Sequence, residues 1–258
     1  MNNWKNILVE ILNNISSTKP SIVAIVGAGA SAASGLATYR GSGGLWEGKL
    51  AQELASVSGF TNDPETVWRW YKERIKKVLQ SQPNQIHHGL VKLEKSGYLN
   101  GVITQNVDGL HRLAGQSDDK LIEIHGTLLK THCFDKCGLT KKINSNNLDF
   151  KIKCECGSYQ RPSVIWFGEL LENSKLIKIE QLLINADILL IIGTSGVVYP
   201  VAQYPFYAKE NGSIIIEFNI EETPFKIIDN LFIKGPADKI FFEFVEVVIS
   251  TINSKAKP

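Results

Sequence analysis

Four short apolar runs stand out along the chain. They lie in the segments SIVAIVGAGAS, GYLNGVITQNVDG, ADILLIIGTSG and GSIIIEFNI, and each ends in turn residues and polar side chains. Continuous rather than alternating hydrophobicity is typical of strands buried on both faces, as in a parallel sheet covered by helices. Helical patterns separate the runs, over Pro64 to Leu79, Ile86 to Ser96 and Lys175 to Ile184. These patterns predict an α/β protein with a doubly wound, Rossmann-like parallel sheet.

Two stretches interrupt this pattern and predict a smaller, second domain. Residues 36–96 are mostly helical in pattern, and residues 131–160 lack apolar runs but hold all four cysteines. The predicted organisation is a Rossmann-like domain over 1–35, 97–130 and 161–258. A loop with a helical insertion over 36–96 and a cysteine module over 131–160 together form the smaller domain.

The composition narrows the class of protein. The chain has 258 residues, 43% of them hydrophobic and 21% charged, as expected of a globular enzyme with a well-buried core. A net charge of +2 is too small to favour nucleic acid or an anionic membrane as a direct partner. The N-terminus is apolar at helical spacing, which predicts an amphipathic helix and no signal peptide. We therefore expect a cytoplasmic protein, in which disulfides are rare.

The first apolar run leads into the glycine-rich segment GAGASAASGLATYRGSGGLW. A strand that ends in Gly27-x-Gly29 lets the backbone approach a pyrophosphate, and Ala32 stands where a third glycine is usual. No acidic residue follows at the spacing that a dinucleotide fingerprint expects; Arg40 and a second glycine run occur instead. The alternative is a tight strand-to-helix turn that binds no ligand.

Polar residues also follow the second apolar run. Gln105, Asn106 and Asp108 come just after a predicted strand, at the edge where open α/β sheets bind ligands, although for this segment alone capping of the next helix is the better explanation. His125 is a candidate general base, because histidine exchanges protons near neutral pH. A lone histidine is more often structural, so this assignment depends on its neighbours.

The four cysteines form two close pairs, Cys133 with Cys137 and Cys154 with Cys156. Four thiolates can hold a tetrahedral zinc ion that stabilises a short module with no core of its own. Neither pair has the common C-x-x-C spacing, and unligated or redox-active cysteines are the alternative. A four-sulfur site leaves no open coordination position, so the expected zinc ion is structural.

Taken together, these segments resemble the sirtuins, the NAD-dependent protein lysine deacylases. The resemblance runs from about Val23 to Ile240. It rests on motifs in family order: GAGASAASGLATYRGSGGLW, PNQIHHGL, TQNVDGLHRLAG, EIHG, the four cysteines, RPSVIWFGE, GTSGVVYP, FNIEET and GPADK. Their co-occurrence is more specific than any single motif.

The resemblance implies a role for each matching residue. His125 would be the general base, with Asn106 as a second catalytic residue. Val164, Phe167, Gly168 and Val198 would line the acyl-lysine tunnel. NAD would be consumed as a co-substrate, and one structural zinc ion would bind the four cysteines. The residues that would contact NAD are Gly27, Ala28, Gly29, Ala30, Ser31, Ala32, Thr38, Tyr39, Arg40, Trp46, Gln105, Asn106, Val107, Asp108, Gly193, Thr194, Ser195, Asn219, Ile220, Glu221 and Ala237.

The helical segment VWRWYKERIKKVL bears on which acyl group the protein prefers. By itself it reads as a solvated helix face, but Tyr71 and Arg74 are three residues apart and share one side. Class III sirtuins, which include desuccinylases and demalonylases, carry such a Tyr-x-x-Arg pair and an alanine in the preceding helix, here Ala55. A guanidinium and a phenol suit a buried carboxylate, and a small residue leaves room for a longer acyl chain.

The chain departs from the usual family pattern at Ala37-Thr38-Tyr39-Arg40, where deacetylase members typically read PDFR, and at Ala30, which replaces a larger aliphatic residue. Thr38 resembles class III members, and Tyr39 keeps the ring of the usual phenylalanine but adds a hydroxyl. The leading hypothesis is an NAD-dependent deacylase of acyl-lysine proteins or peptides that prefers succinyl or malonyl groups. A deacetylase without acidic preference, an NAD hydrolase or ADP-ribosyltransferase on the same scaffold, and a non-catalytic NAD sensor are the alternatives.

Overall fold

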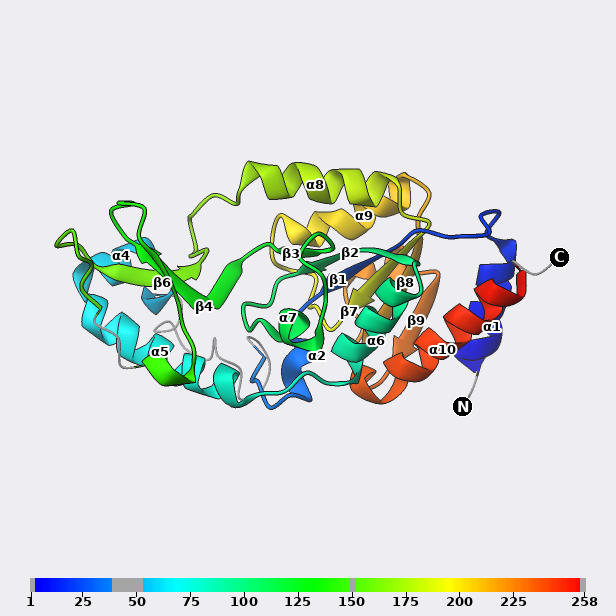
Figure 1. The fold of residues 1–258 in the computed structure, drawn as a ribbon. Helices are drawn as coiled ribbons and strands as arrows, with labels where there is room; N and C mark the ends of the chain where they lie inside the picture. The colour runs from blue at the N-terminus through cyan, green and yellow to red at the C-terminus, as the bar shows by residue number, and fades with distance from the viewer. Residues whose placement is uncertain (1–2, 39–52, 149–151, 256–258) are drawn as a thin grey trace.

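The computed structural model describes residues 3–38, 53–148 and 152–255. Its larger unit is built on a parallel sheet of six strands in the order β3-β2-β1-β7-β8-β9 (Figure 1). The strands are β1 (Ile22–Val26), β2 (Leu99–Thr104), β3 (Leu121–Glu123), β7 (Ile188–Ile192), β8 (Ile214–Asn219) and β9 (Leu231–Lys234). This is the doubly wound order, in which the direction of winding reverses between β1 and β7. The predicted Rossmann-like sheet is confirmed.

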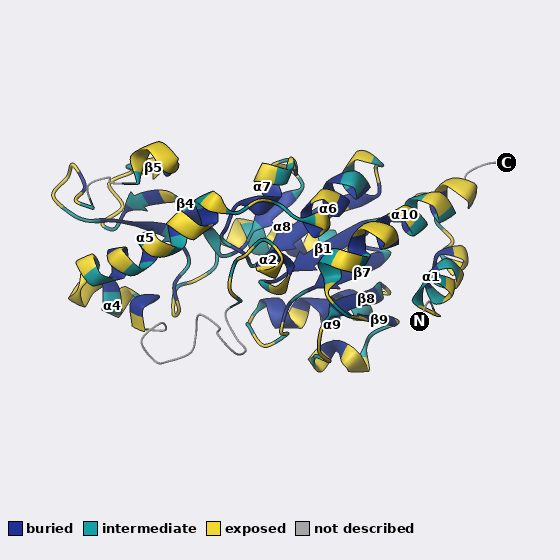
Figure 2. Cartoon of the chain, turned by 90° about the horizontal axis from the view of Figure 1, so that it is seen from below, coloured by how far each residue is buried: buried dark blue, intermediate teal, exposed yellow. Residues whose placement is uncertain are grey.

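Helices cover both faces of this sheet because its strands are apolar on both sides. One face packs against α1 (Asn3–Asn14), α6 (Gln85–Lys95) and α10 (Ala237–Lys255). The other packs against α8 (Asn173–Ile184) and α9 (Tyr204–Glu210). Figure 2 shows the strands in the buried colour, with the exposed colour on the outer faces of the helices. None of the described helices is long and apolar enough to span a bilayer.

The smaller unit combines the helical insertion with the cysteine module. It contains α4 (Val57–Asn62), α5 (Pro64–Gln80) and an antiparallel sheet in the order β5-β4-β6. Those strands are β4 (Gly126–Cys133), β5 (Thr140–Lys142) and β6 (Gln160–Val164). Phe60 and Trp68 from the helices share a core with Val164 of β6 and with Ile143 and Trp166 just beyond β5 and β6, so α4, α5 and the cysteine module form one smaller unit.

Local signals in the sequence set the helix bounds. Asp63 accepts a hydrogen bond from Thr66 N and precedes Pro64, so α5 begins with a side-chain cap and proline in its first turn. Asn84 caps α6 in the same way by accepting from Ile86 N. Although α6 lies in the predicted 36–96 segment, Ile86, Leu90 and Leu93 bury it against the large sheet and α10. The larger unit therefore includes α6.

The short elements connect these layers around the edge where the strands end. They are α2 (Gly29–Ala32), α7 (Leu110–Ala114) and the 3-10 turns η1 (Ser145–Asn147), η2 (Val201–Gln203) and η3 (Pro224–Ile227). Both α2 and η3 follow directly on loops at the carboxyl ends of β1 and β8. That edge, at the reversal between β1 and β7, is where doubly wound sheets bind ligands.

Candidate active site

The glycine loop after β1 lies against the loop after β7. Gly27 N donates to Ile192 O at 2.9 Å, and Gly29 N donates to Gly193 O at 2.8 Å. A side chain on Gly27 would bring its Cβ to 2.6 Å from the Gly193 oxygen, so no larger residue fits there. The glycines thus allow two loops to meet at the reversal point, and both loops line a cavity.

The polar residues after β2 fasten these loops to one another. Gln105 Nε2 donates to Thr194 Oγ1 at 2.9 Å, and Asn106 Nδ2 donates to Gly27 O at 3.0 Å. Ser31 Oγ donates to the buried Asp108 carboxylate at 2.8 Å, which also accepts from Leu110 N. Burial raises the pKa of Asp108, against the effect of these hydrogen bonds. Asp108 therefore caps α7 and holds α2.

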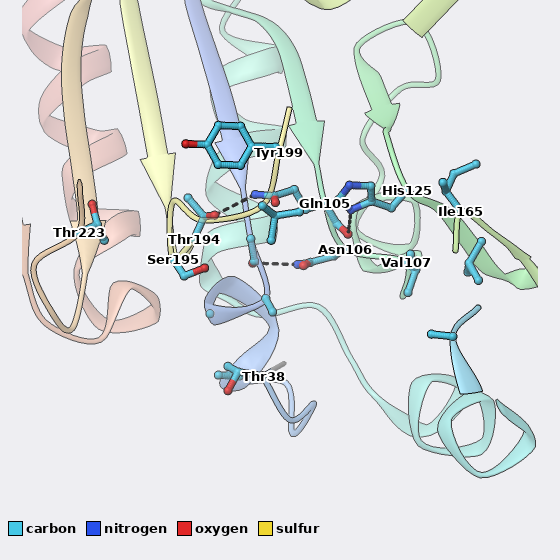
Figure 3. A pocket seen from close by; sticks show the side chains of 18 of the residues that line it. Thr38, Gln105, Asn106, Val107, His125, Ile165, Thr194, Ser195, Tyr199 and Thr223 are labelled. Atoms are coloured by element: carbon cyan, nitrogen blue, oxygen red, sulfur yellow. Dashed lines mark hydrogen bonds between the residues drawn. The ribbon is translucent and has the colours of Figure 1, made fainter. Parts of the chain in front are cut away.

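His125 stands beside this network, on the turn between β3 and β4 (Figure 3). Its Nδ1 lies 3.2 Å from Gln105 O, an acceptor, so we assign the ring proton to Nδ1 and the lone pair to Nε2. Burial lowers the pKa of His125 below 6.5, the hydrogen bond to Gln105 opposes this, and the charge of Lys175 lowers it further. A neutral ring with a lone pair on Nε2 can accept a proton.

One continuous cavity of about 890 Å³ joins these features. Figure 3 shows Thr38, Gln105, Asn106, His125, Thr194 and Thr223 around it. It brings together most of the residues predicted from the sequence: Gly27, Ala28, Gly29, Ala32, Thr38, Gln105, Asn106, Val107, His125, Gly193, Thr194, Ser195, Asn219, Ile220, Glu221, Ala237, Ala55, Tyr71, Arg74, Val164, Phe167, Gly168 and Val198.

Three predicted residues lie behind the cavity wall. Ala30 is buried in the core of the larger unit, and Ser31 and Asp108 are buried in the hydrogen-bonded network below the glycine loop. Tyr39, Arg40 and Trp46, also predicted to contact NAD, lie outside the described residues. The wall also contains residues that the sequence analysis missed, among them Ile165, Trp166, Tyr199 and Thr223. Trp166 belongs to the motif RPSVIWFGE, so the motif could have marked it as a site residue, although nothing in the sequence indicates its role.

At one end the cavity reaches the smaller unit. The buried Tyr71 and the half-buried Arg74 of α5 line it there, together with Ala55. Trp166 Nε1 donates to the Tyr71 hydroxyl at 2.8 Å, and the Arg74 guanidinium stacks 4.5 Å from the centre of the Trp70 ring. The predicted pair therefore points into the same cavity as His125.

The segment after β6 forms the rim beside this end. Phe167 N donates to Ala55 O at 3.1 Å, which joins the rim to the helical insertion. Arg161 holds the turn by binding both oxygens of Glu169, at 2.5 and 2.7 Å, while Trp166 N donates to the same carboxylate. Phe167 remains about half exposed at the mouth, an apolar surface next to the cavity.

The opposite end is formed by loops after β8 and β9. Asn219, the last residue of β8, donates through Nδ2 to Thr194 O at 2.9 Å. Ile220, Glu221 and Ala237, where α10 begins, continue the wall. The cavity thus extends from the sheet's reversal point in two directions, toward β8 and toward α5.

The four cysteines converge in the smaller unit, away from the cavity wall. Their Sγ atoms all lie within 4.8 Å of one another, with Cys133 and Cys156 3.5 Å apart and Cys137 and Cys154 3.6 Å apart. Zinc–sulfur bonds of about 2.3 Å in a tetrahedron place neighbouring sulfurs about 3.8 Å apart. The cluster therefore fits a structural zinc ion despite the unusual spacings.

Comparison with known proteins places the chain in a family. The Sir2 family model matches residues 27–200. The chain is 41% identical to the NAD-dependent protein deacylase of Pyrococcus furiosus, over 92% of this chain and 96% of that protein. It is 42% identical to the NAD-dependent protein deacylase of Pyrococcus abyssi, over 93% and 98%. The chain belongs to the Sir2 family.

Solved structures give the same result. The crystal structure of a Sir2 homolog–NAD complex is 38% identical, with a TM-score of 0.85, over 95% of this chain and 94% of that chain. A Sir2–p53 peptide–NAD+ complex is 30% identical, with a TM-score of 0.79, over 96% and 98%. The resemblance found in the sequence is thereby confirmed.

Proposed function

We propose that this protein is an NAD-dependent protein lysine deacylase that prefers acidic acyl groups, malonyl and succinyl. One observation carries the preference: Tyr71 and Arg74 line the same cavity as His125 and the loops of the NAD side. Membership of the Sir2 family, with close relatives named NAD-dependent protein deacylases, supports the activity itself. Complexes of Sir2 proteins with NAD and with a peptide support the two substrates.

The two ends of the cavity suit two substrates. NAD is consumed in the reaction: it loses nicotinamide and accepts the acyl group on its ribose. The β8 end, with Asn219 and Glu221, is proposed to hold the adenosine part, while the loops with Gln105 and Asn106 hold the nicotinamide ribose. The acyl-lysine enters past Phe167 and extends its acyl chain toward α5.

His125 has the properties that proton transfer requires. Because Nδ1 is engaged by Gln105 O, Nε2 is the atom that accepts a proton from a ribose hydroxyl. The lowered pKa keeps the ring neutral at physiological pH, which is the form that a base needs. The proposed zinc ion has no part in this chemistry, because its four sulfur ligands would leave no position open for substrate.

The acidic preference follows from charge at the end of the acyl channel. A carboxylate there would meet the Arg74 guanidinium and the Tyr71 hydroxyl, and charge-assisted hydrogen bonds are roughly twice as strong as neutral ones. An acetyl group carries no carboxylate that could pair with them. Ala55 leaves volume for the longer chain, since any larger side chain at this position of the wall would occupy it.

The test is turnover of one peptide with acetyl-, malonyl- or succinyl-lysine, followed by nicotinamide release and by mass of the peptide. We expect release only when an acylated peptide is present, and a higher kcat/KM for the acidic groups. Equal kcat/KM for all three would remove the preference and leave the deacylase. NAD loss of equal rate without peptide would favour an NAD hydrolase.

A further inference from the structure

A buried acidic residue stands behind the β8 end of the cavity. Glu217 lies inside β8 and is 0% exposed. Side chains alternate along the strand, so Glu217 shares with Ile215 the face that packs against α8 and α9, while Phe218 lies on the other. A carboxylate in a sheet interior costs free energy unless hydrogen bonds compensate for its lost hydration.

The hydrogen bonds of Glu217 come from the cavity wall. Thr223 Oγ1 donates to Oε2 at 2.9 Å, and Asn219 Nδ2 donates to Oε1 at 3.2 Å. Both donors line the cavity. Asn219 Nδ2 also reaches Thr194 O, and Thr194 in turn accepts from Gln105. Glu217 therefore orients two wall residues and is connected through them to the centre of the site.

A second carboxyl group adjoins Glu217. Asp229 follows η3, and both its side-chain oxygens are buried with no donor from the described part of the chain. Burial first, then the charge of Glu217 and a hydrogen bond with it, raises the pKa of Asp229 to about 7. Two carboxyl groups in such contact share a proton. It resides on Asp229, because Glu217 already has two donors and Asp229 has none.

Few other charges act on this pair. Lys209 of α9 lowers the pKa of Asp229, but its ammonium group donates to Asn230 Oδ1 at 2.8 Å. Lys226 of η3 pairs with Glu222 at the exposed surface. Burial, and then the charge of Glu180 on α8, raises the pKa of Tyr204 on α9. The strand neighbours of Glu217 are apolar, Ile191 on β7 and Phe232 on β9.

We infer that Glu217 and Asp229 are positioning residues for the adenosine end of the site, and that their shared proton holds the 223–229 turn against β8 in the geometry that binds NAD. The inference rests on the proposed function, because it takes NAD as the ligand of this cavity. Glu217 is fixed in the sheet, whereas Asp229 lies on a turn, so loss of the proton displaces Asp229. Thr223 and Pro224 belong to that turn and line the cavity, and their displacement weakens binding.

The direction of the pH effect follows from the proton count. With the proton in place the pair carries one negative charge, and without it two charges face each other in a buried site. Affinity for the nucleotide should therefore fall as pH rises through about 7. Linkage to one proton limits the loss to roughly tenfold per pH unit.

The experiment measures ADP-ribose binding to the whole chain by calorimetry between pH of about 6 and about 8.5, a range over which one linked proton is resolved. We expect the affinity of the native protein to fall at least ~threefold over this range. Asp229→Asn should bind with little pH dependence, since its amide donates to Glu217 at every pH. The affinity of Glu217→Gln should also change little with pH, because this variant removes the charge that would repel Asp229. Either variant alone is therefore enough to test the pair. Glu210→Gln, an exposed acid on α9, is the matched control and should follow the native curve.

The outcomes separate the two proposals. A native affinity that does not change with pH, or variants that keep the native slope, would overturn the role of the pair. No binding of ADP-ribose at any pH would instead contradict the proposed function. As a second readout, the KM for NAD should rise with pH in the native protein and not in Asp229→Asn, with kcat at saturating NAD following the same pH profile in both.

Discussion

The Trp166 indole nitrogen donates a hydrogen bond of 2.8 Å to the Tyr71 hydroxyl, across the boundary between β6 and α5. Trp166 is buried and also stacks 3.4 Å from the Arg161 guanidinium, so its ring cannot turn freely. The phenol of Tyr71 is consequently fixed at the end of the cavity. Arg74, one helical turn further, lies over Trp70. The polar end of the proposed acyl channel is held by aromatic side chains.

The first prediction concerns the charge of Arg74. Arg74→Met keeps an unbranched side chain but removes the charged donor. Hydrogen bonds to charged groups contribute about 1.5–3 kcal/mol, so kcat/KM for a succinyl peptide should fall roughly tenfold to 100-fold. Turnover of an acetyl peptide should stay within about twofold of the native rate, because an acetyl group has no carboxylate that Arg74 could bind.

The matched control is Arg69→Met, an exposed arginine on the same helix. It removes the same charge outside the cavity and should leave both substrates unaffected. If Arg74→Met and Arg69→Met behave alike, the acidic preference does not arise from Arg74, and only that part of the proposal fails.

The second prediction tests the orientation of Tyr71. Trp166→Phe keeps a ring but removes the donor, and one hydrogen bond contributes about 1 kcal/mol, so the succinyl-to-acetyl ratio should fall about fivefold. Trp68→Phe is the control, because Trp68 Nε1 donates to Gln160 O in the same core. That control should lower the melting temperature without changing the ratio. An unchanged ratio in Trp166→Phe would show that the indole serves packing alone.

The parts of the fold that could be predicted are those with a local signal. The strands β1, β2, β7 and β8 were identified because each is a continuous apolar run, and α5 because its residues follow a helical pattern. β3 and β9 are only three and four residues long and leave no such run. α10 was missed although Phe241, Phe244, Val245 and Val248 recur at helical spacing, so its signal was present in the sequence.

The site shows a similar division. Most of the residues predicted from motifs line one cavity, whereas Trp166, Tyr199 and Thr223 were missed although the motifs contain them. The contact of Gly27 with Gly193, or of Trp166 with Tyr71, joins positions far apart in sequence, and no pattern in one chain indicates such pairs. Asp108 illustrates the limit, because its carboxylate is turned toward Ser31 and Leu110 N, the helix-capping alternative that its position after β2 allowed.

The third prediction concerns the pH dependence of His125. Burial lowers its pKa below 6.5, so the neutral ring persists to a lower pH and the acid limb of kcat/KM should have its midpoint below 6.5. Lys175 lowers the pKa as well, so Lys175→Gln should shift that midpoint upward. Lys178→Gln is the control, since Lys178 binds the carbonyl of Asp119 at a more exposed position of α8.

Replacement of the ring itself completes this test. His125→Ala should lose about 10²–10⁴-fold in kcat while NAD still binds, because general base catalysis contributes about that much. Retained turnover would remove His125 from its assigned role. A midpoint that is the same in Lys175→Gln and the native protein would contradict the electrostatic explanation only.

The fourth prediction concerns the cysteine cluster. Metal analysis should give one zinc ion per chain, and Cys137→Ser should lower that content and the melting temperature, because structural zinc sites contribute directly to folding. The control is Glu155→Gln, which changes the residue between Cys154 and Cys156 but keeps all four ligands. This variant should bind zinc normally. Native protein with well under one equivalent that melts at the same temperature after chelation would exclude a structural metal.

The fifth prediction concerns the ion pair that holds the rim of the cavity. Arg161 is 5% exposed and binds both oxygens of Glu169; burial opposes ionisation of Glu169, but the hydrogen bonds from Arg161 and Trp166 N lower its pKa below 4.5. The ion pair therefore stabilises the fold above pH 4.5, and this stabilisation is lost as pH falls through the lowered pKa of Glu169. Arg161→Met removes the guanidinium bonds to Glu169, which is partly exposed and keeps the bond from Trp166 N, and hydrogen bonds to charged groups contribute about 1.5–3 kcal/mol. We expect a lower melting temperature and a higher KM for peptide, with unchanged affinity for ADP-ribose. Arg112→Met, an exposed arginine paired with Glu123, should change neither, and equal KM values in the two variants would show that the pair does not position the rim.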